Sequence, residues 1–323
     1  MAYSEEILRR ARARLEQAKQ ERDRENAEHK REAYERYPRL QEIDRELQLT
    51  MTQLMAAAFR QGEDPAQAVA RIRDKNLALQ REREWILEAG DFEEGFLDET
   101  PVCVKCGGTG YEGSHMCSCL QELCRQEQKK ELTSLLGSGR ETFENFRLDV
   151  YSDVYDDTLG VSPRKLMQSN FNICRRYAQN FTPQSGNLLF SGATGLGKTF
   201  LSACIARQVA DRGFSVTYET SVRMFADFEA AKFGGEEYQD RIRRYFDCDL
   251  LIIDDLGTEL ITQFTVSAMY HLINTRMMAN CATIISTNLV PEAIEGRYSP
   301  QIASRILGTY RLIKFAGTDI RRL

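Results

Sequence analysis

One stretch of the 323-residue chain has residue types and spacing suited to phosphate chemistry. It runs from Gly192 to Thr199, reads GATGLGKT, and fits the pattern GxxxxGK[ST] without a mismatch. Its glycines let successive backbone N–H groups turn toward phosphate oxygens, and a helix that follows adds its positive N-terminal end. We expect ATP to be bound by Gly192, Ala193, Thr194, Gly195, Leu196, Gly197, Lys198 and Thr199. Lys198 would reach the β- and γ-phosphates, and Thr199 would ligate Mg²⁺.

A second motif places two carboxylates after an apolar run. Residues 250–253 read LLII and predict a buried strand that ends in Asp254 and Asp255. Asp254 would hold Mg²⁺ directly or through water, and Asp255 is placed to polarise the attacking water. The alternative is an acidic turn that is only solvated, which is the weaker interpretation beside a complete P-loop.

Two further polar residues follow in the order that ATP hydrolysis needs. A predicted strand at 283–286 leads into Asn288, which could orient the attacking water between the γ-phosphate and Asp255. Arg305 comes later, and an arginine there suits a finger that reaches the ATP of a neighbouring subunit and stabilises charge in the transition state. The alternative for Arg305 is an ordinary surface arginine.

A cysteine cluster precedes these motifs and indicates a metal site. Its four members form two short pairs, and they are Cys103, Cys106, Cys117 and Cys119. Four thiolates on two knuckles can close a tetrahedral Zn²⁺ shell. The second pair is CxC instead of CxxC, so His115 or Cys124 could replace one ligand. A redox role for the first pair lacks the expected βαβ setting.

Composition limits the classes of protein that remain. The net charge is −5 and the pI about 5.5, so the whole surface cannot wrap nucleic acid, although a local basic groove is compatible with these values. No run approaches the ~18 apolar residues of a membrane span. The charged N-terminus has no signal-peptide core. We expect a cytoplasmic protein that does not bind membranes.

The elements around the phosphate motifs alternate between strand and helix. Strands are predicted at 187–190, 215–218, 250–253 and 283–286, and helices at 200–210, 221–232 and 264–279. This alternation argues for a parallel sheet.

The first ninety or so residues have a helical composition, rich in Glu, Arg, Gln, Ala and Leu. Pro38 suits a helix start. Apolar residues recur at helical spacing on either side of a predicted turn at 61–65, and they are Leu40, Ile43, Leu47 and Leu54, then Val69, Ile72, Leu79 and Ile86. We expect a long charged helix followed by a helical hairpin. It is either a solvated spacer or a docking module for a partner, and the thin stripe favours docking.

Together these motifs resemble the helicase-loader branch of the AAA+ ATPases, the DnaC/DnaI-like proteins, and the related IstB-type transposition ATPases. The matching segments span residues 143–323 and read FENFRL, GATGLGKT, LLIIDDLGTE, INTR, ISTNL, IASRI and GTDIR. The resemblance implies that Asn288 is sensor I, that Arg305 is the arginine finger, and that Arg321 is a weaker candidate for a second sensing arginine. It also implies a core without a large C-terminal lid. Many AAA+ ATPases carry Glu where this chain has Asp255, so we expect slow hydrolysis that a partner or DNA stimulates.

The predicted fold class is therefore α/β, an AAA+ P-loop ATPase core with a parallel sheet, preceded by an α-helical region and a small zinc-binding module. The predicted regions are a helical partner-docking region at 1–95, a Cys-rich zinc module at 96–130, a linker at 131–142 and the ATPase domain at 143–323.

Two functions fit these features. The first is an ATP-dependent DNA replication protein that loads a hexameric replicative helicase onto single-stranded DNA, uses ATP as the switch, and self-assembles through Arg305 in trans. The second is an IstB-like transposition helper that binds DNA and recruits a transposase. The zinc cluster and the long N-terminal region favour the first. A small-molecule kinase is disfavoured, because it needs no arginine such as Arg305 from a neighbouring subunit. An adaptor with a purely structural ATP site is disfavoured too, because it needs no water-orienting residues such as Asp255 and Asn288.

A possible DNA contact lies between the second strand and Asp254. Residues 224–233 and the basic residues after them resemble the helical insertion by which loaders and initiators contact DNA, with aromatics for stacking and cations for phosphates. The alternative is that Phe225, Phe228 and Phe233 fill the core. We expect Lys232 and Arg244 to be the better probes, because neither is a natural core residue.

Overall fold

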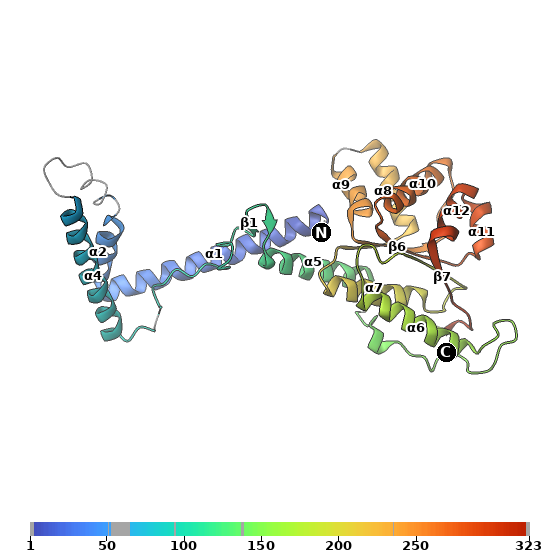
Figure 1. Cartoon of the computed structure of the whole chain (residues 1–323), viewed down its shortest axis with the longest axis horizontal. Helices are drawn as coiled ribbons and strands as arrows, with labels where there is room; N and C mark the ends of the chain where they lie inside the picture. The colour runs from blue at the N-terminus through green and yellow to red at the C-terminus, as the bar shows by residue number, and fades with distance from the viewer. Residues whose placement is uncertain are drawn as a thin grey trace. The chain divides into compact units, whose positions relative to one another are not determined.

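The computed structural model describes residues 3–50, 52, 65–93, 95–136, 139–234 and 236–320 (Figure 1). The chain divides into two compact units, a smaller one at 14–115 and a larger one formed by 1–13 with 116–323. Within the described residues, no helix is both long enough and apolar enough to cross a membrane.

The predicted long helix and the two helices after it are confirmed. α1 (Glu5–Arg36) is followed by α2 (Pro38–Gln48), with Pro38 in its first turn, and by α4 (Pro65–Ala89), which packs against α2 (Figure 1). The residues buried between them are Ala33, Leu40, Ile43, Leu79, Ile86 and Leu97. Val69 is half exposed, at 50%, so the predicted stripe is thinner than expected at this end of α4. Leu54 and most of the predicted turn lie outside the described residues.

A short β-ribbon, β1 (Tyr111–Glu112) and β2 (His115–Met116), precedes α5 (Ser118–Leu136). The helix continues to Leu136, where a linker was expected from residue 131. Its continuation has a physical reason, because Leu132 is buried in the core of the larger unit.

The larger unit contains a parallel sheet, as predicted, and the sheet has five strands. The strands are β3 (Asn187–Ser191), β4 (Val216–Thr220), β5 (Leu250–Leu256), β6 (Ala282–Thr287) and β7 (Tyr310–Lys314). Their order is β4-β5-β6-β3-β7, and every neighbouring pair is parallel. β7 was not predicted, since its short sequence YRLIK does not alternate between apolar and polar residues and follows α12 (Pro300–Thr309) directly.

Helices cover both faces of this sheet (Figure 1). One face packs against α6 (Pro163–Gln179) and α7 (Lys198–Asp211). The other packs against α8 (Ser221–Phe233), α9 (Glu236–Asp247), α10 (Gln263–Met278), α11 (Pro291–Arg297) and α12 (Pro300–Thr309). Alternate strand residues face opposite ways, so Leu188 and Phe190 join the first core while Leu189 joins the second. The sheet is therefore buried on both faces.

Candidate nucleotide and metal sites

The P-loop connects the end of β3 to the start of α7, as the sequence predicted. Gly195 and Gly197 have φ values of +74° and +89°, which glycine adopts without steric cost. A Cβ on Gly192 would meet the Phe315 carbonyl oxygen at 2.3 Å, and one on Gly195 would meet Asp319 Oδ1 at 1.8 Å. The three glycines are thus required by backbone conformation or by close approach, and they leave the backbone amides of the loop at a helix N-terminus.

Lys198 lies at the centre of this loop and is almost fully buried. Its Nζ donates to the carbonyl oxygens of Gly192 (2.7 Å) and Ala193 (2.8 Å) and to Asn288 Oδ1 (2.6 Å). Asn288 follows β6, and the strand order places β6 directly beside β3. The sheet therefore brings together two residues that are ninety positions apart in the sequence.

Asp254, at the end of β5, is a buried carboxylate surrounded by donors. It accepts hydrogen bonds from the hydroxyls of Thr199 (3.4 Å), Tyr218 (2.6 Å) and Ser286. Burial, and then the neighbouring carboxylate, raise the pKa of Tyr218 well above its usual value, so this phenol remains a donor. The Thr199 hydroxyl and the Asp254 carboxylate are hard oxygen ligands of the kind that Mg²⁺ prefers, and their adjacency fits the predicted metal role.

Asp255 occupies a β-bulge, where the register between β5 and β6 shifts. Its φ of +54° is uncommon for a residue with a side chain, although Asp tolerates it better than most. The backbone N–H donates to Ser286 Oγ (3.0 Å), and the carbonyl accepts from Ser221 Oγ (3.0 Å) and Thr258 Oγ1 (2.9 Å). The bulge interrupts the β5–β6 ladder at Asp255, and these side-chain hydroxyls hold the Asp255 backbone instead.

Sequence reasoning missed three of the residues that support this pair of carboxylates, namely Tyr218, Ser221 and Ser286. The signal for Ser286 was present, because it is a polar residue within a strand whose other members are apolar or threonine. A buried hydroxyl needs a partner, and Asp254 and the Asp255 amide supply it.

Arg305 is not part of this cluster. It lies on α12, where its Nε donates to Asn274 Oδ1, its Nη2 to Tyr270 Oη and its Nη1 to the Gln301 carbonyl oxygen. Within the described residues, none of its hydrogen bonds reaches the P-loop. Arg321 falls outside the described residues.

The expectation that Arg244 is available to DNA is wrong. Its guanidinium is largely buried on α9 and pairs with Asp227 (3.0 Å) and Glu219 (3.2 Å). Phe225 and Phe228 are buried in the core, as the alternative interpretation held. Lys232 remains exposed, with its Nζ 5.4 Å from the centre of the Phe264 ring. The side chain of Phe233 lies outside the described residues.

The four cysteines of the predicted zinc module do converge. The Sγ atoms of Cys103, Cys106, Cys117 and Cys119 all lie within 4.8 Å of one another. A tetrahedral shell with Zn–S bonds of ~2.3 Å has sulfur atoms about 3.8 Å apart, so the donor set and spacing fit zinc. Neither His115 nor Cys124 belongs to this group. Cys124 is buried elsewhere, and burial raises its pKa to about 11, which disfavours the thiolate that a metal needs.

Comparison with known proteins finds similarity in the larger unit. Residues 169–307 match the family described as IstB-like ATP binding protein. The replicative helicase loader DnaC of Buchnera aphidicola subsp. Acyrthosiphon pisum is 21% identical over 207 residues, 62% of this chain and 80% of that protein. A protein named as ATP-binding in an insertion sequence of Mycobacterium tuberculosis is 28% identical over 122 residues, 38% of this chain and 48% of that one. The crystal structure of the DnaC helicase loader is 19% identical with a TM-score of 0.45, covering 54% of this chain and 98% of that one.

Proposed function

We propose that this protein, whose residues 169–307 match the model of the IstB-like ATP-binding proteins, is an ATPase that loads a replicative helicase onto single-stranded DNA. ATP binding and hydrolysis would be its switch. The observation that carries the ATPase part is a convergence of four residues at the carboxyl ends of the strands. They are Lys198, Thr199, Asp254 and Asn288. Each provides a group that phosphoryl transfer needs, and the four lie at or after the carboxyl ends of three neighbouring strands, β5, β6 and β3.

Each residue has a role that follows from its chemistry. The Lys198 ammonium would leave its carbonyl partners for the β- and γ-phosphates, which are stronger acceptors. Thr199 and Asp254 would hold Mg²⁺, which neutralises phosphate charge when bound. Asp255 would accept the proton of the attacking water, and Asn288 would orient that water. Asp255 is one methylene shorter than Glu, so its carboxylate reaches less far and hydrolysis should be slow.

Two features support action on a partner as part of an assembly. Arg305 carries a charge that its own P-loop does not use, which supports self-assembly with Arg305 acting in trans. The Cys-rich module would be a structural zinc site that fixes its fold. Together with the helical N-terminal region, it would dock the hexameric helicase.

The choice of a loader over a transposition helper rests on the relatives. The protein named DnaC is matched over 80% of its length, whereas the insertion-sequence protein is matched over 48%. The second candidate keeps support from the family match, since IstB-like proteins give the family its name. In that case the protein would bind DNA and recruit a transposase.

The nucleotide part is tested by two substitutions. Lys198→Ala should abolish ATP binding, because the loop loses its cation near the phosphates. Asp255→Asn should bind ATP but not turn it over, because it removes the acceptor for the water proton and leaves Thr199 and Asp254 in place. Lys165→Ala, at an exposed position of α6, is the matched lysine control. Unchanged turnover in Asp255→Asn would reassign the base, and unchanged ATP affinity in Lys198→Ala would refute the site.

The partner is tested with the same variant. Asp255→Asn, held in its ATP-bound state, should retain a hexameric helicase from native cell extract, whereas Lys198→Ala should not. Recovery of a transposase instead would establish the second candidate. In the unsubstituted protein, stimulation of ATP turnover by single-stranded DNA but not by duplex DNA supports the loader, and the reverse preference contradicts it.

A further inference from the structure

We propose that Tyr270 and Asn274 position Arg305, and that they hold its guanidinium ready for the ATP of a second copy of this chain. The inference rests on the proposed ATPase function and deepens it, because it names residues that set how well one subunit can act on its neighbour. Tyr270 lies in none of the segments that carry the family resemblance, and Asn274 lies in the segment INTR, for which the sequence suggested no role.

The contacts fix the guanidinium in three directions. Nε donates to Asn274 Oδ1 at 3.1 Å, Nη2 to Tyr270 Oη at 2.8 Å, and Nη1 to the Gln301 carbonyl oxygen at 3.2 Å. The Arg305 Cζ also lies 4.5 Å from the centre of the Tyr270 ring, within the range of a cation–π contact. A long side chain normally loses considerable rotamer entropy when it is held in one place. Here that ordering is already present in a single subunit.

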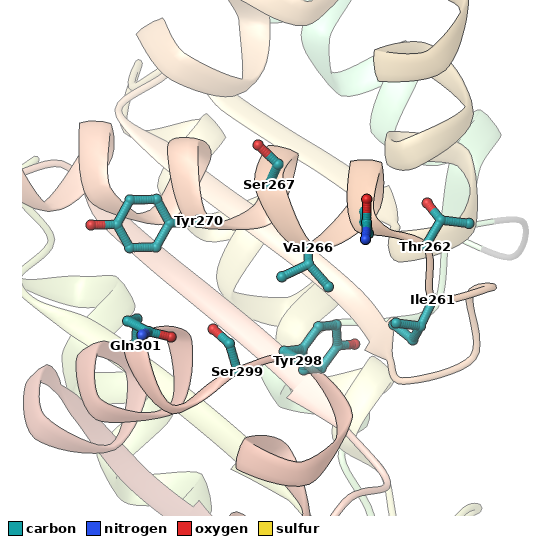
Figure 2. A pocket seen from close by; sticks show the side chains of 9 residues that line it. Ile261, Thr262, Val266, Ser267, Tyr270, Tyr298, Ser299 and Gln301 are labelled. Atoms are coloured by element: carbon teal, nitrogen blue, oxygen red, sulfur yellow. The ribbon is translucent and has the colours of Figure 1, made fainter.

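The two helices that carry these residues form a rigid frame. Tyr270 and Asn274 lie one turn apart on α10, and Gln301 and Arg305 lie one turn apart on α12, so each pair shares a helix face. Residues of both helices are buried in the same core, and they are Met269, Leu272, Ile273, Ile302 and Ile306. Figure 2 shows Tyr270 and Gln301 on the two helices, at one end of a surface hollow of about 660 Å³. Two of the three hydrogen-bond partners of the guanidinium, Tyr270 and Gln301, therefore line this accessible surface.

The charge of Arg305 has no compensating carboxylate. Its three partners are an amide, a phenol and a backbone carbonyl, and no salt bridge joins it to a carboxylate of the described residues. Arg244, by contrast, pairs with Asp227 and Glu219. Three of the five N–H donors of the Arg305 guanidinium have described partners. The remaining two, with a full positive charge, are suited to a phosphate oxygen.

A purely structural role for Arg305 makes a different prediction. If Arg305 only joins α10 to α12, then removing Tyr270 would lower stability and leave catalysis by folded protein unchanged. If Tyr270 positions Arg305, turnover falls while the subunit's own ATP affinity stays the same, because its P-loop is intact. Misplacement by ~1 Å can cost about 100-fold. With Asn274 and Gln301 still present, we expect roughly a tenfold loss in Tyr270→Ala.

The test mixes subunits with complementary defects. Full-length Tyr270→Ala, Arg305→Ala and Lys198→Ala are assayed alone and in pairs for ATP turnover with single-stranded DNA, and separately for binding of a fluorescent ATP analogue. Tyr270→Ala should resemble Arg305→Ala, with lower turnover and parental affinity. Mixing either with Lys198→Ala should restore turnover, because intact P-loops then meet intact Arg305 residues. Met278→Ala, at an 82% exposed position of the same helix, should behave as the parent.

The outcomes separate the inference from the function on which it rests. Parental turnover in Arg305→Ala would refute the trans role of Arg305 itself. Loss in Arg305→Ala with parental turnover in both Tyr270→Ala and Asn274→Ala would overturn only the positioning role. If Tyr270→Ala does not fold, Tyr270→Phe keeps the ring and removes one hydrogen bond. Tyr270→Phe should lose less turnover than the double variant that combines it with Asn274→Ala. Parental turnover in Tyr270→Phe, in Asn274→Ala and in the double variant would overturn the inference.

Discussion

Arg276 offers a direct test of what holds together the strands that carry the site. It is 1% exposed, lies on α10 and has no carboxylate partner in its hydrogen bonds. Its guanidinium donates to the carbonyl oxygens of Tyr245, Phe246, Cys248 and Ala282 and to Thr283 Oγ1. Tyr245 and Phe246 are in the last turn of α9, where carbonyls lack partners within the helix. One side chain thus joins the end of α9, the approach to β5 and the start of β6.

The size of the effect follows from these contacts. Arg276→Met fills a similar volume but leaves four buried carbonyls without their donor. Each buried carbonyl without a partner destabilises the fold by about 1–3 kcal/mol. Removing the buried guanidinium also removes its desolvation penalty, which offsets part of this loss. We expect the free energy of unfolding of the larger unit to fall by about 3–5 kcal/mol. For a domain of this size that corresponds to a decrease in Tm of roughly 6–20 °C.

The assay must report on the larger unit. The single tryptophan, Trp85, lies on α4 in the smaller unit, so its fluorescence follows the wrong region. Hydrogen exchange of peptides from β5 and β6, measured by mass spectrometry across a urea series, gives the relevant opening free energy. Arg311→Met, at an exposed position of β7, is the control and should change stability by less than about 0.5 kcal/mol. A loss below about 1 kcal/mol in Arg276→Met would refute the reasoning.

Two further predictions concern the candidate sites. Metal analysis of reduced, purified protein should find one zinc per chain. Cys106→Ser or strong chelation should increase hydrogen exchange at residues 101–119 while the ATPase core stays folded. Protein without zinc would contradict the assignment. Gly195→Ala should weaken ATP binding, because φ is +74° and the added Cβ would meet Asp319 Oδ1 at 1.8 Å. Gly296→Ala, whose Cβ meets nothing within 4 Å, is its control, and equal ATP affinity of the two variants would show that the loop tolerates a side chain at residue 195.

The parts of the fold that the sequence predicted are those with one strong periodic signal. The four predicted strands lie within a few residues of β3, β4, β5 and β6, because each is a run that is buried on both faces. α6 was missed although its signals were present, since Ser162 caps the helix and Pro163 occupies its first turn. β7 could not be found, because it is defined by pairing with β3 and not by its own composition. The family resemblance was recognised correctly from motifs that the P-loop region carries.

Within the site, sequence order predicted which residues meet but not how they are held. Lys198 was expected to reach the γ-phosphate and Asn288 to orient the water that attacks it, and the two side chains are in contact. The bulge at Asp255 was invisible, because a positive φ at an aspartate depends on the register between two strands. The hydroxyls of Tyr218 and Ser286 come from different strands, so only the strand order shows that both reach Asp254.

The arginines of the larger unit show why residue type alone could not identify the functional cation. Arg244 and Arg305 were both expected to act on phosphates, one of DNA and the other of ATP. The structure separates them by what surrounds the charge. Arg244 is neutralised by carboxylates and Arg276 is buried among carbonyls, so neither can meet an external anion without breaking the fold. Arg305 is held by three hydrogen bonds to neutral groups, two of them solvent-exposed. A cation that acts on another subunit's phosphate must be oriented without being paired to a carboxylate. Its charge must be in place and not neutralised before the two subunits meet.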